Sequence, residues 1–141
     1  FSVHPAPDAA HAVVLHPPAA GEGANAFSLV PTAAVLPARI VSIDAPPFAV
    51  AMTNDRAVVA ERSDTAKVYG VHVAKMPELT STRYELASPP SAAGVITSVR
   101  LAYVAQKHPE GRITFVHLDT GTARTLTGFE LAARVVDGSK P

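Results

Sequence analysis

Charged and histidine side chains gather at three polar turns, each of which separates two apolar runs of the sequence. The candidate residues are His16, Arg62, Asp64, Lys107, His108 and Glu110. Imidazole, guanidinium, ammonium and carboxylate groups recognise ligands through charge and hydrogen bonds, so the three turns are the candidate binding surface. Hairpin turns are polar in any case, and solvation alone is the alternative explanation for these residues.

Six histidines raise the question of a metal site, because neutral imidazole is a common zinc ligand. His11 and His16 are five residues apart, which places them on opposite faces of an extended strand. An offset of 45 residues aligns His72 with His117, and both stand among apolar neighbours, where we expect them to pack or to hydrogen-bond between repeats. The sequence therefore predicts no metal site and no cofactor.

The residue patterns of common catalytic sites do not occur in the sequence. There is no serine at a strand-to-helix elbow, no paired carboxylates and no H-E-x-x-H pattern. Residues Gly21 to Ala26 (GEGANA) fit the loose dinucleotide pattern G-x-G-x-x-A, but a phosphate-binding loop must open a helix, and Phe27 to Pro31 are typical of a strand. The absence of cysteine excludes disulfides and thiolate metal sites. We therefore expect no catalytic residues in this chain.

Short strands joined by tight turns must position these side chains. The chain has 13 prolines, and its apolar runs are short, alternating or β-branched, and end in Pro, Gly or Asp.

Length and charge limit the possible organisation and partners of the chain. A length of 141 residues fits one domain. Twelve basic and twelve acidic side chains cancel, which argues against nucleic acid or an anionic membrane as partners. No apolar run is long enough to span a membrane. From the start at Phe1, with no initiator Met and no basic and apolar leader, we expect a boundary made either by processing or by the choice of the expressed segment.

The sequence also contains an internal repeat. Residues 57–87 align with 102–132 without a gap, and ten of the 31 positions are identical, more than a composition rich in Ala and Val gives by chance. The runs GVITSV, LAYVAQ, RITFVHL and ARTLTGFEL in the last repeat alternate or are β-branched, and the turns HPEG and DTGT separate the last three of them. The repeat therefore predicts a four-stranded antiparallel meander.

The same pattern divides the whole chain into three such units, here called blades. We predict one all-β repeat domain, 1–141, with blades at 1–46, 47–90 and 91–136 and a polar tail at 137–141. Pro-Pro pairs close the first and second units. The residues expected in the cores between blades are Val13, Leu15, Val58, Ala60, Val71, Val73, Tyr103, Ala105, Val116 and Leu118.

The order LAYVA, loop, RITFVHLDTGTARTLTGFEL resembles the repeat of β-propellers of the YVTN or WD40-like kind, although the Trp-Asp dipeptide of WD40 repeats is absent. The resemblance implies that the three blades form part of a propeller ring. It implies that ligands bind at the end where the loops between second and third strands open, which is where the six candidate residues fall. It also implies a bacterial protein of the periplasm or cell surface.

The function that we expect is a non-catalytic binding or scaffolding module. The alternative is a fragment of a propeller enzyme, hydrolase or lactonase-like, whose active site needs blades not present here, with His4, Thr53, Thr97 and Ser98 contributing. Three blades are fewer than a ring needs, so apolar faces must be covered by a partner. The expected partner is a protein, further blades, or a second copy that closes a six-bladed ring as a homodimer.

Overall fold

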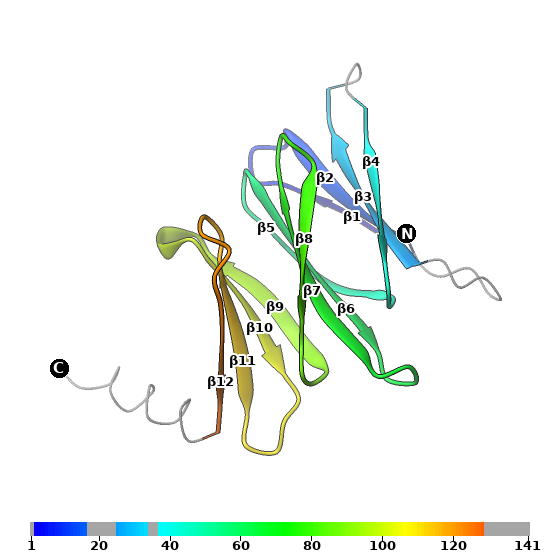
Figure 1. The fold of residues 1–141 in the computed structure, drawn as a ribbon. Helices are drawn as coiled ribbons and strands as arrows, with labels where there is room; N and C mark the ends of the chain where they lie inside the picture. Colours follow the sequence, from blue (N-terminus) through cyan, green and yellow to red (C-terminus); the bar gives the residue numbers. More distant parts are fainter. Residues whose placement is uncertain (1, 17–24, 34–36, 129–141) are drawn as a thin grey trace.

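The computed structural model describes residues 2–16, 25–33 and 37–128, and within them the fold is all-β (Figure 1). Three separate four-stranded antiparallel sheets follow one another along the chain, each a meander in which consecutive strands pair, which confirms the predicted fold class. In the described ranges, the helical content is one 3₁₀ turn, η1 (Thr97–Val99), and no helix is long and apolar enough to cross a membrane.

Each sheet is one blade. Blade 1 consists of β1 (Ser2–Pro5), β2 (His11–His16), β3 (Asn25–Pro31) and β4 (Arg39–Ile43). Blade 2 consists of β5 (Pro47–Met52), β6 (Arg56–Ser63), β7 (Val68–Lys75) and β8 (Thr80–Glu85). Blade 3 consists of β9 (Pro90–Ile96), β10 (Leu101–Gln106), β11 (Arg112–His117) and β12 (Ala123–Thr127). The first strand of blade 3 begins earlier than the run GVITSV, and it ends earlier because η1 interrupts that run.

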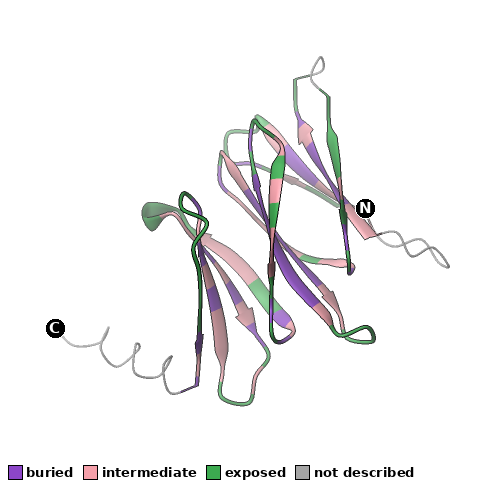
Figure 2. Cartoon of the chain, in the orientation of Figure 1, coloured by how far each residue is buried: buried purple, intermediate pink, exposed green. Residues whose placement is uncertain are grey.

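The blades are stacked face to face, with blade 2 between the other two. Contacts between neighbouring blades are concentrated near the first strands, where β5 touches both β1 and β9, so the blades fan out from that edge (Figure 1). Side chains alternate between the two faces of a strand, and both faces of blade 2 are covered. The strands β6 and β7 are therefore buried along nearly their whole length (Figure 2).

Two apolar cores hold the stack together. We call the face of a blade that points to the next blade in the chain its forward face, and the opposite face its rear face. The core between blades 1 and 2 contains forward-face residues Val13, Phe27, Leu29 and Ile43 and rear-face residues Ala57, Val59, Ala74 and Met76. The core between blades 2 and 3 contains forward-face residues Val58, Val71, Val73 and Leu86 and rear-face residues Ala102, Val104, Val116 and Leu118, with Tyr69 beside them.

The two cores use the same positions of the blade. The strand register pairs Val13 with Leu29 in blade 1 and Val58 with Val73 in blade 2. Extending these pairings through each sheet makes the forward set of blade 1 equivalent, residue for residue, to that of blade 2. The rear sets of blades 2 and 3 are equivalent in the same way. One interface is thus repeated twice along the chain.

Most of the predicted core is confirmed, with a difference in blade 3. Leu15 is only partly buried, against the core between blades 1 and 2. Tyr103 and Ala105 lie on the forward face of blade 3, where they remain partly exposed, and their neighbours Ala102 and Val104 occupy the core instead. The sequence could not assign the face, because the equivalent residues of blade 2 are buried on both faces.

The predicted gapless alignment at an offset of 45 residues is wrong for the third and fourth strands of blades 2 and 3. It holds for β6 and β10, where Val59 is equivalent to Val104. However, Val59 pairs with His72, while Val104 pairs with Thr114, so His117 is not the counterpart of His72. The β10–β11 hairpin is three residues shorter than the β6–β7 hairpin, and an odd shift moves every side chain to the other face of a strand.

Candidate functional site

Arg62 and Asp64 lie at the β6–β7 turn, as predicted from the sequence, but they are joined to each other. Nε and Nη2 of Arg62 donate hydrogen bonds of 2.9 Å to the two carboxylate oxygens of Asp64. Nη1 donates to the carbonyl oxygen of Pro90 at 3.0 Å, and the guanidinium lies over the ring of Phe48. The guanidinium holds the pKa of Asp64 below its usual value. Arg62 thus ties the turn of blade 2 to the first strand of blade 3.

The other predicted turn residues of blade 3 stand in the β10–β11 hairpin. Lys107 is exposed, and His108 accepts at Nδ1 a hydrogen bond of 3.1 Å from the backbone N–H of Glu110. The turn closes as predicted, with the N–H of Gly111 donating to the carbonyl of His108 at 3.0 Å and Gly111 at a φ of 83°. Lys107 and Glu110 are exposed, so this turn presents a polar surface to solvent.

His16 lies apart from the other five predicted residues, at the end of β2 in blade 1. Its Nε2 is 2.7 Å from Oγ of Ser28 on β3. The turn that follows, with most of the Gly21 to Ala26 pattern, falls outside the described residues. The segment after it forms strand β3, so the helix that a phosphate-binding loop requires does not follow this pattern. The six predicted residues thus share one end of the fold without converging on one point.

A second cluster of charges, which sequence reasoning missed, lies at the opposite end of the blades. Nη1 and Nη2 of Arg100 donate to the two carboxylate oxygens of Asp55 at 2.9 and 3.0 Å, and Nη2 donates to Asp119 at 2.9 Å. Arg56 donates from Nε to the carbonyl of Leu118 at 3.1 Å. The guanidinium of Arg100 lowers the pKa of both aspartates. This cluster fastens the β5–β6 turn of blade 2 to two turns of blade 3.

The sequence held a signal for this cluster. Asp55 and Arg100 are 45 residues apart, immediately before the equivalent strands β6 and β10. Opposite charges at one repeat position therefore meet across the interface between consecutive blades.

A buried carboxylate holds the link between blades 1 and 2. Glu61 has no exposed surface, and its Oε2 accepts the backbone N–H groups of Asp44 at 2.9 Å and Ala45 at 3.1 Å. Its Oε1 accepts a hydrogen bond of 2.5 Å from Nε of Arg83, and Nε2 of His72 lies 3.4 Å away. Burial alone raises the pKa of a carboxyl group, but these partners outweigh burial and lower the pKa of Glu61 to about 2.

The position of Glu61 carries a polar side chain in every blade. In blade 3 it is Gln106, which accepts from Ser88 Oγ at 2.9 Å and donates from Nε2 to Thr114 Oγ1 at 2.6 Å. In blade 1 it is His16, which contacts Ser28. Ser28, His72 and Thr114 are themselves register equivalents. Each blade thus carries one polar pair on its rear face, and in blades 2 and 3 that pair holds the preceding inter-blade link.

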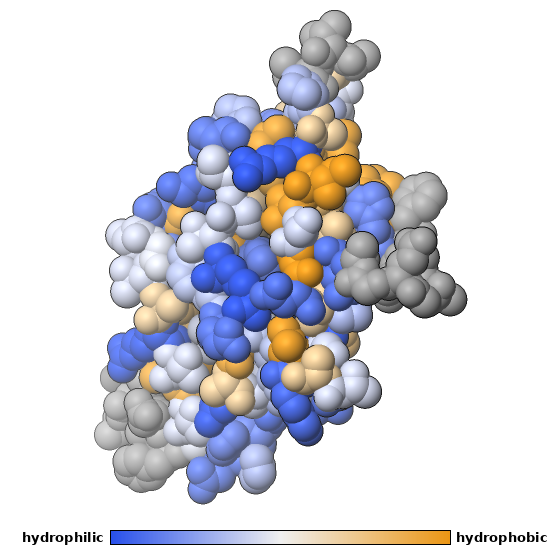
Figure 3. Space-filling model, turned by 45° about the vertical axis from the view of Figure 1, so that its right-hand side comes forward, coloured by the Kyte–Doolittle hydropathy of each residue, from blue (hydrophilic) through white to orange (hydrophobic). Residues whose placement is uncertain are grey.

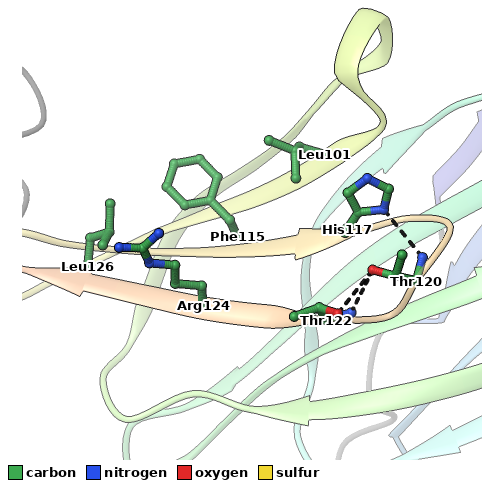
Figure 4. Close-up of a pocket in the computed structure, with 7 residues that line it drawn as sticks. All are labelled: Leu101, Phe115, His117, Thr120, Thr122, Arg124 and Leu126. Carbon is green, nitrogen blue, oxygen red and sulfur yellow. Dashed lines mark hydrogen bonds between the residues drawn. The ribbon is translucent and has the colours of Figure 1, made fainter. Parts of the chain in front are cut away.

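The forward face of blade 3 is hollowed. Figure 4 shows Leu101, Phe115 and Leu126 standing on three successive strands around a depression of about 320 Å³, with Arg124 beside them and His117, Thr120 and Thr122 at one end. A smaller depression of about 190 Å³ lies between the β11–β12 turn and blade 2, lined in part by Lys75, Tyr84 and Asp119. The larger depression is mainly apolar, and its chemistry suits aliphatic or aromatic groups.

The residues considered for a propeller enzyme make local contacts. Thr53 is buried, and its Oγ1 accepts the N–H of Arg56 at 2.9 Å and donates to Asp55 at 3.1 Å, so it caps a turn. Nε2 of His4 lies 2.9 Å from Oγ of Ser2. Thr97 and Ser98 form η1. They belong to three different blades.

Among the described residues, no three His, Asp or Glu side chains gather closely enough to hold a metal ion.

Comparison with known proteins gives no further assignment. The sequence matches no protein-family model and no curated protein.

Proposed function

We propose that the chain is a non-catalytic scaffolding module. It binds protein partners through the two end faces of its blade stack, which are the rear face of blade 1 and the forward face of blade 3. The observation that carries the proposal is a difference between the charged side chains, which stabilise the fold, and the side chains on the end faces. The charged groups of Glu61, Arg83, Arg100, Asp55 and Arg62 are engaged in contacts that fix the blades and their links. The side chains that remain accessible on the end faces are largely apolar.

The apolar character of the end faces supports this role. On the rear face of blade 1, Val3 is 55% exposed and Ile40 is 69% exposed, and Figure 3, turned to bring the blade 1 side forward, shows apolar side chains gathered there. On the forward face of blade 3, Phe115 and Leu126 border the depression of about 320 Å³. Contiguous apolar patches on a soluble protein are typical of interaction surfaces.

The proposal is tested by asking whether the chain has an activity of its own. The purified chain is incubated with ester and lactone substrates, and we expect no turnover above that of a heat-denatured sample. Fluorescence of an apolar dye such as ANS is measured in parallel, and enhancement by the native chain is expected if the end faces are accessible. Turnover that co-purifies with the chain and falls on substitution of His4 or Ser98 would refute the scaffolding role.

A further inference from the structure

The rear face of blade 1 repeats the surface with which blades 2 and 3 pack on the blade before them. The register equivalents of the rear-face core residues are Ala12, Val14, Val30 and Thr32 in blade 1, Ala57, Val59, Ala74 and Met76 in blade 2, and Ala102, Val104, Val116 and Leu118 in blade 3. The first position is Ala in all three blades and the second is Val in all three. Only in blade 1 does this surface have no blade against it among the described residues.

The polar part of the rear face is repeated as well. His16 and Ser28 stand 2.7 Å apart at the positions where Glu61 and His72 face blade 1, and where Gln106 and Thr114 face blade 2. If the rear face of blade 1 contacted only water, nothing would favour the apolar pair Ala12 and Val14 together with the polar pair His16 and Ser28 at these positions. The rear face of blade 1 therefore has the features of a face that receives another blade.

The forward face of blade 3 has the matching features. The equivalents of Val58, Val71 and Val73, which contact blade 3, are Tyr103, Ile113 and Phe115. These side chains are apolar and only partly buried. Tyr103 crosses Gly94 on β9, where an added Cβ would come within 2.3 Å of its hydroxyl, so its ring lies across the first strand of the blade.

From these equivalences we infer that a second copy of the chain docks head to tail, with the rear face of its blade 1 on the forward face of blade 3. This inference rests on the proposed scaffolding function and names its partner. Each new interface repeats the two interfaces already present within the chain. Because the docked faces differ, the contact is heterologous and can close into a ring. A ring of two copies has six blades, within the range of propeller-like rings.

The test combines oligomeric state with a complementation design. Light scattering behind a sizing column is expected to give the wild type twice the chain mass of 14.6 kDa. Val14→Glu places a charge on the rear face of blade 1, and Phe115→Glu places one on the forward face of blade 3. Each variant alone is expected to be monomeric. Each of the two contacts in the ring joins the rear face of one copy's blade 1 to the forward face of the other copy's blade 3, so one substitution alters both contacts. An equimolar mixture should recover a two-chain species, because one native pair of faces remains.

Control variants separate loss of docking from loss of folding. Ala66→Glu adds the same charge in the exposed β6–β7 turn and should leave the dimer intact. Circular dichroism and thermal unfolding check that each variant folds. If Val14→Glu or Phe115→Glu does not fold, Ile40→Glu and Arg124→Glu change exposed residues on the same two faces.

Several outcomes would overturn the inference. They are a folded wild-type monomer, a series of growing masses instead of a two-copy species, and a dimer that only one of the two variants dissociates, which indicates pairing of identical faces. A monomer whose end faces bind ANS leaves the scaffolding proposal in place. Hydrolase activity refutes that proposal whatever the mass is, so the two failures are distinguishable.

Discussion

Nε of Arg83 lies 2.5 Å from Oε1 of Glu61, across the middle strand that separates them in blade 2. The residue between them is Gly70, which pairs with Glu61 on β6 and with Glu85 on β8. The ion pair passes over this glycine, and the same carboxylate receives the backbone of the link from blade 1. A single buried side chain therefore joins three strands of one blade to the end of the preceding blade.

We predict that Glu61 makes the fold sensitive to acid. The partners of Glu61 lower its pKa to about 2, below the usual value of a glutamate. The folded state therefore gains stability above the unfolded pKa and loses it as the pH falls towards the folded pKa. The loss is expected to be about 3 kcal/mol over this window. Denaturant unfolding of the wild type at several pH values between neutral and pH 2 measures it.

Glu61→Gln is the matched variant for this pH dependence. It keeps the shape of the side chain but cannot titrate, so its stability should be lower at neutral pH and should vary less in the acid window. An equal acid sensitivity of the variant and the wild type would assign the effect to Asp55, Asp64 and Asp119, whose pKa values are also lowered.

We predict that Gly70→Ala breaks the ion pair between Glu61 and Arg83 although both charged residues are kept. An added Cβ would lie 2.7 Å from Oε1 of Glu61 and 2.6 Å from Nη2 of Arg83, so both charged groups must move while they remain largely desolvated. The expected loss of unfolding free energy is about 2–4 kcal/mol. A double-mutant cycle with Glu61→Gln checks the mechanism. The loss should shrink in the Glu61→Gln background, and full additivity of the two substitutions would contradict it.

The strands of this protein were largely predictable from the sequence, because period-2 alternation and turn residues are local signals. The run LAYVAQ coincides with β10 and the run RITFVHL agrees with β11 to within one residue, whereas β9 starts four residues earlier than the run GVITSV. The equivalence of His72 with Thr114, in place of His117, was not predictable in the same way. Register depends on hairpin length, and a three-residue difference in one turn is invisible when identical residues happen to align at a constant offset.

The candidate site was predicted only in part. The turns that carry Arg62, Asp64 and Lys107 were found, because polar residues between apolar runs indicate a turn. The contact of Arg62 with Pro90 depends on how blade 3 packs on blade 2, which no local pattern contains. Glu61 was not among the candidate site residues. Its burial follows from the packing of blade 1 on blade 2.

We predict that Arg100 stabilises the junction between blades 2 and 3 at a cost in backbone strain. Its φ of 55° lies in the left-handed region, which a non-glycine residue adopts at a cost of about 1 kcal/mol. Arg100→Ala should lose about 1–2 kcal/mol, because two bidentate contacts with aspartates disappear while the strain remains. Arg100→Gly should lose about 1 kcal/mol less, because glycine relieves the strain.

Salt and pH check the cause of the Arg100 effect. The difference between wild type and Arg100→Ala should shrink in concentrated salt, and also at a pH low enough to protonate Asp55 and Asp119. Both aspartates are more than a third exposed, so screening reaches them. A difference that is independent of both conditions would indicate loss of packing and not of charge.

Val71 and Ile113 occupy the same forward-face position in blades 2 and 3, and we predict that only substitution of Ile113 has a cost that depends on protein concentration. Val71 is fully buried in the core between those blades, so Val71→Ala should lower the free energy of unfolding by about 2 kcal/mol at every protein concentration. Ile113 is only partly buried within one chain. Ile113→Ala should therefore cost less than about 1 kcal/mol in a dilute sample and more as the concentration rises, because head-to-tail docking buries this side chain. Unfolding curves recorded over a range of concentrations distinguish the two, and a loss for Ile113→Ala that does not change with concentration would mean that no second copy covers the face.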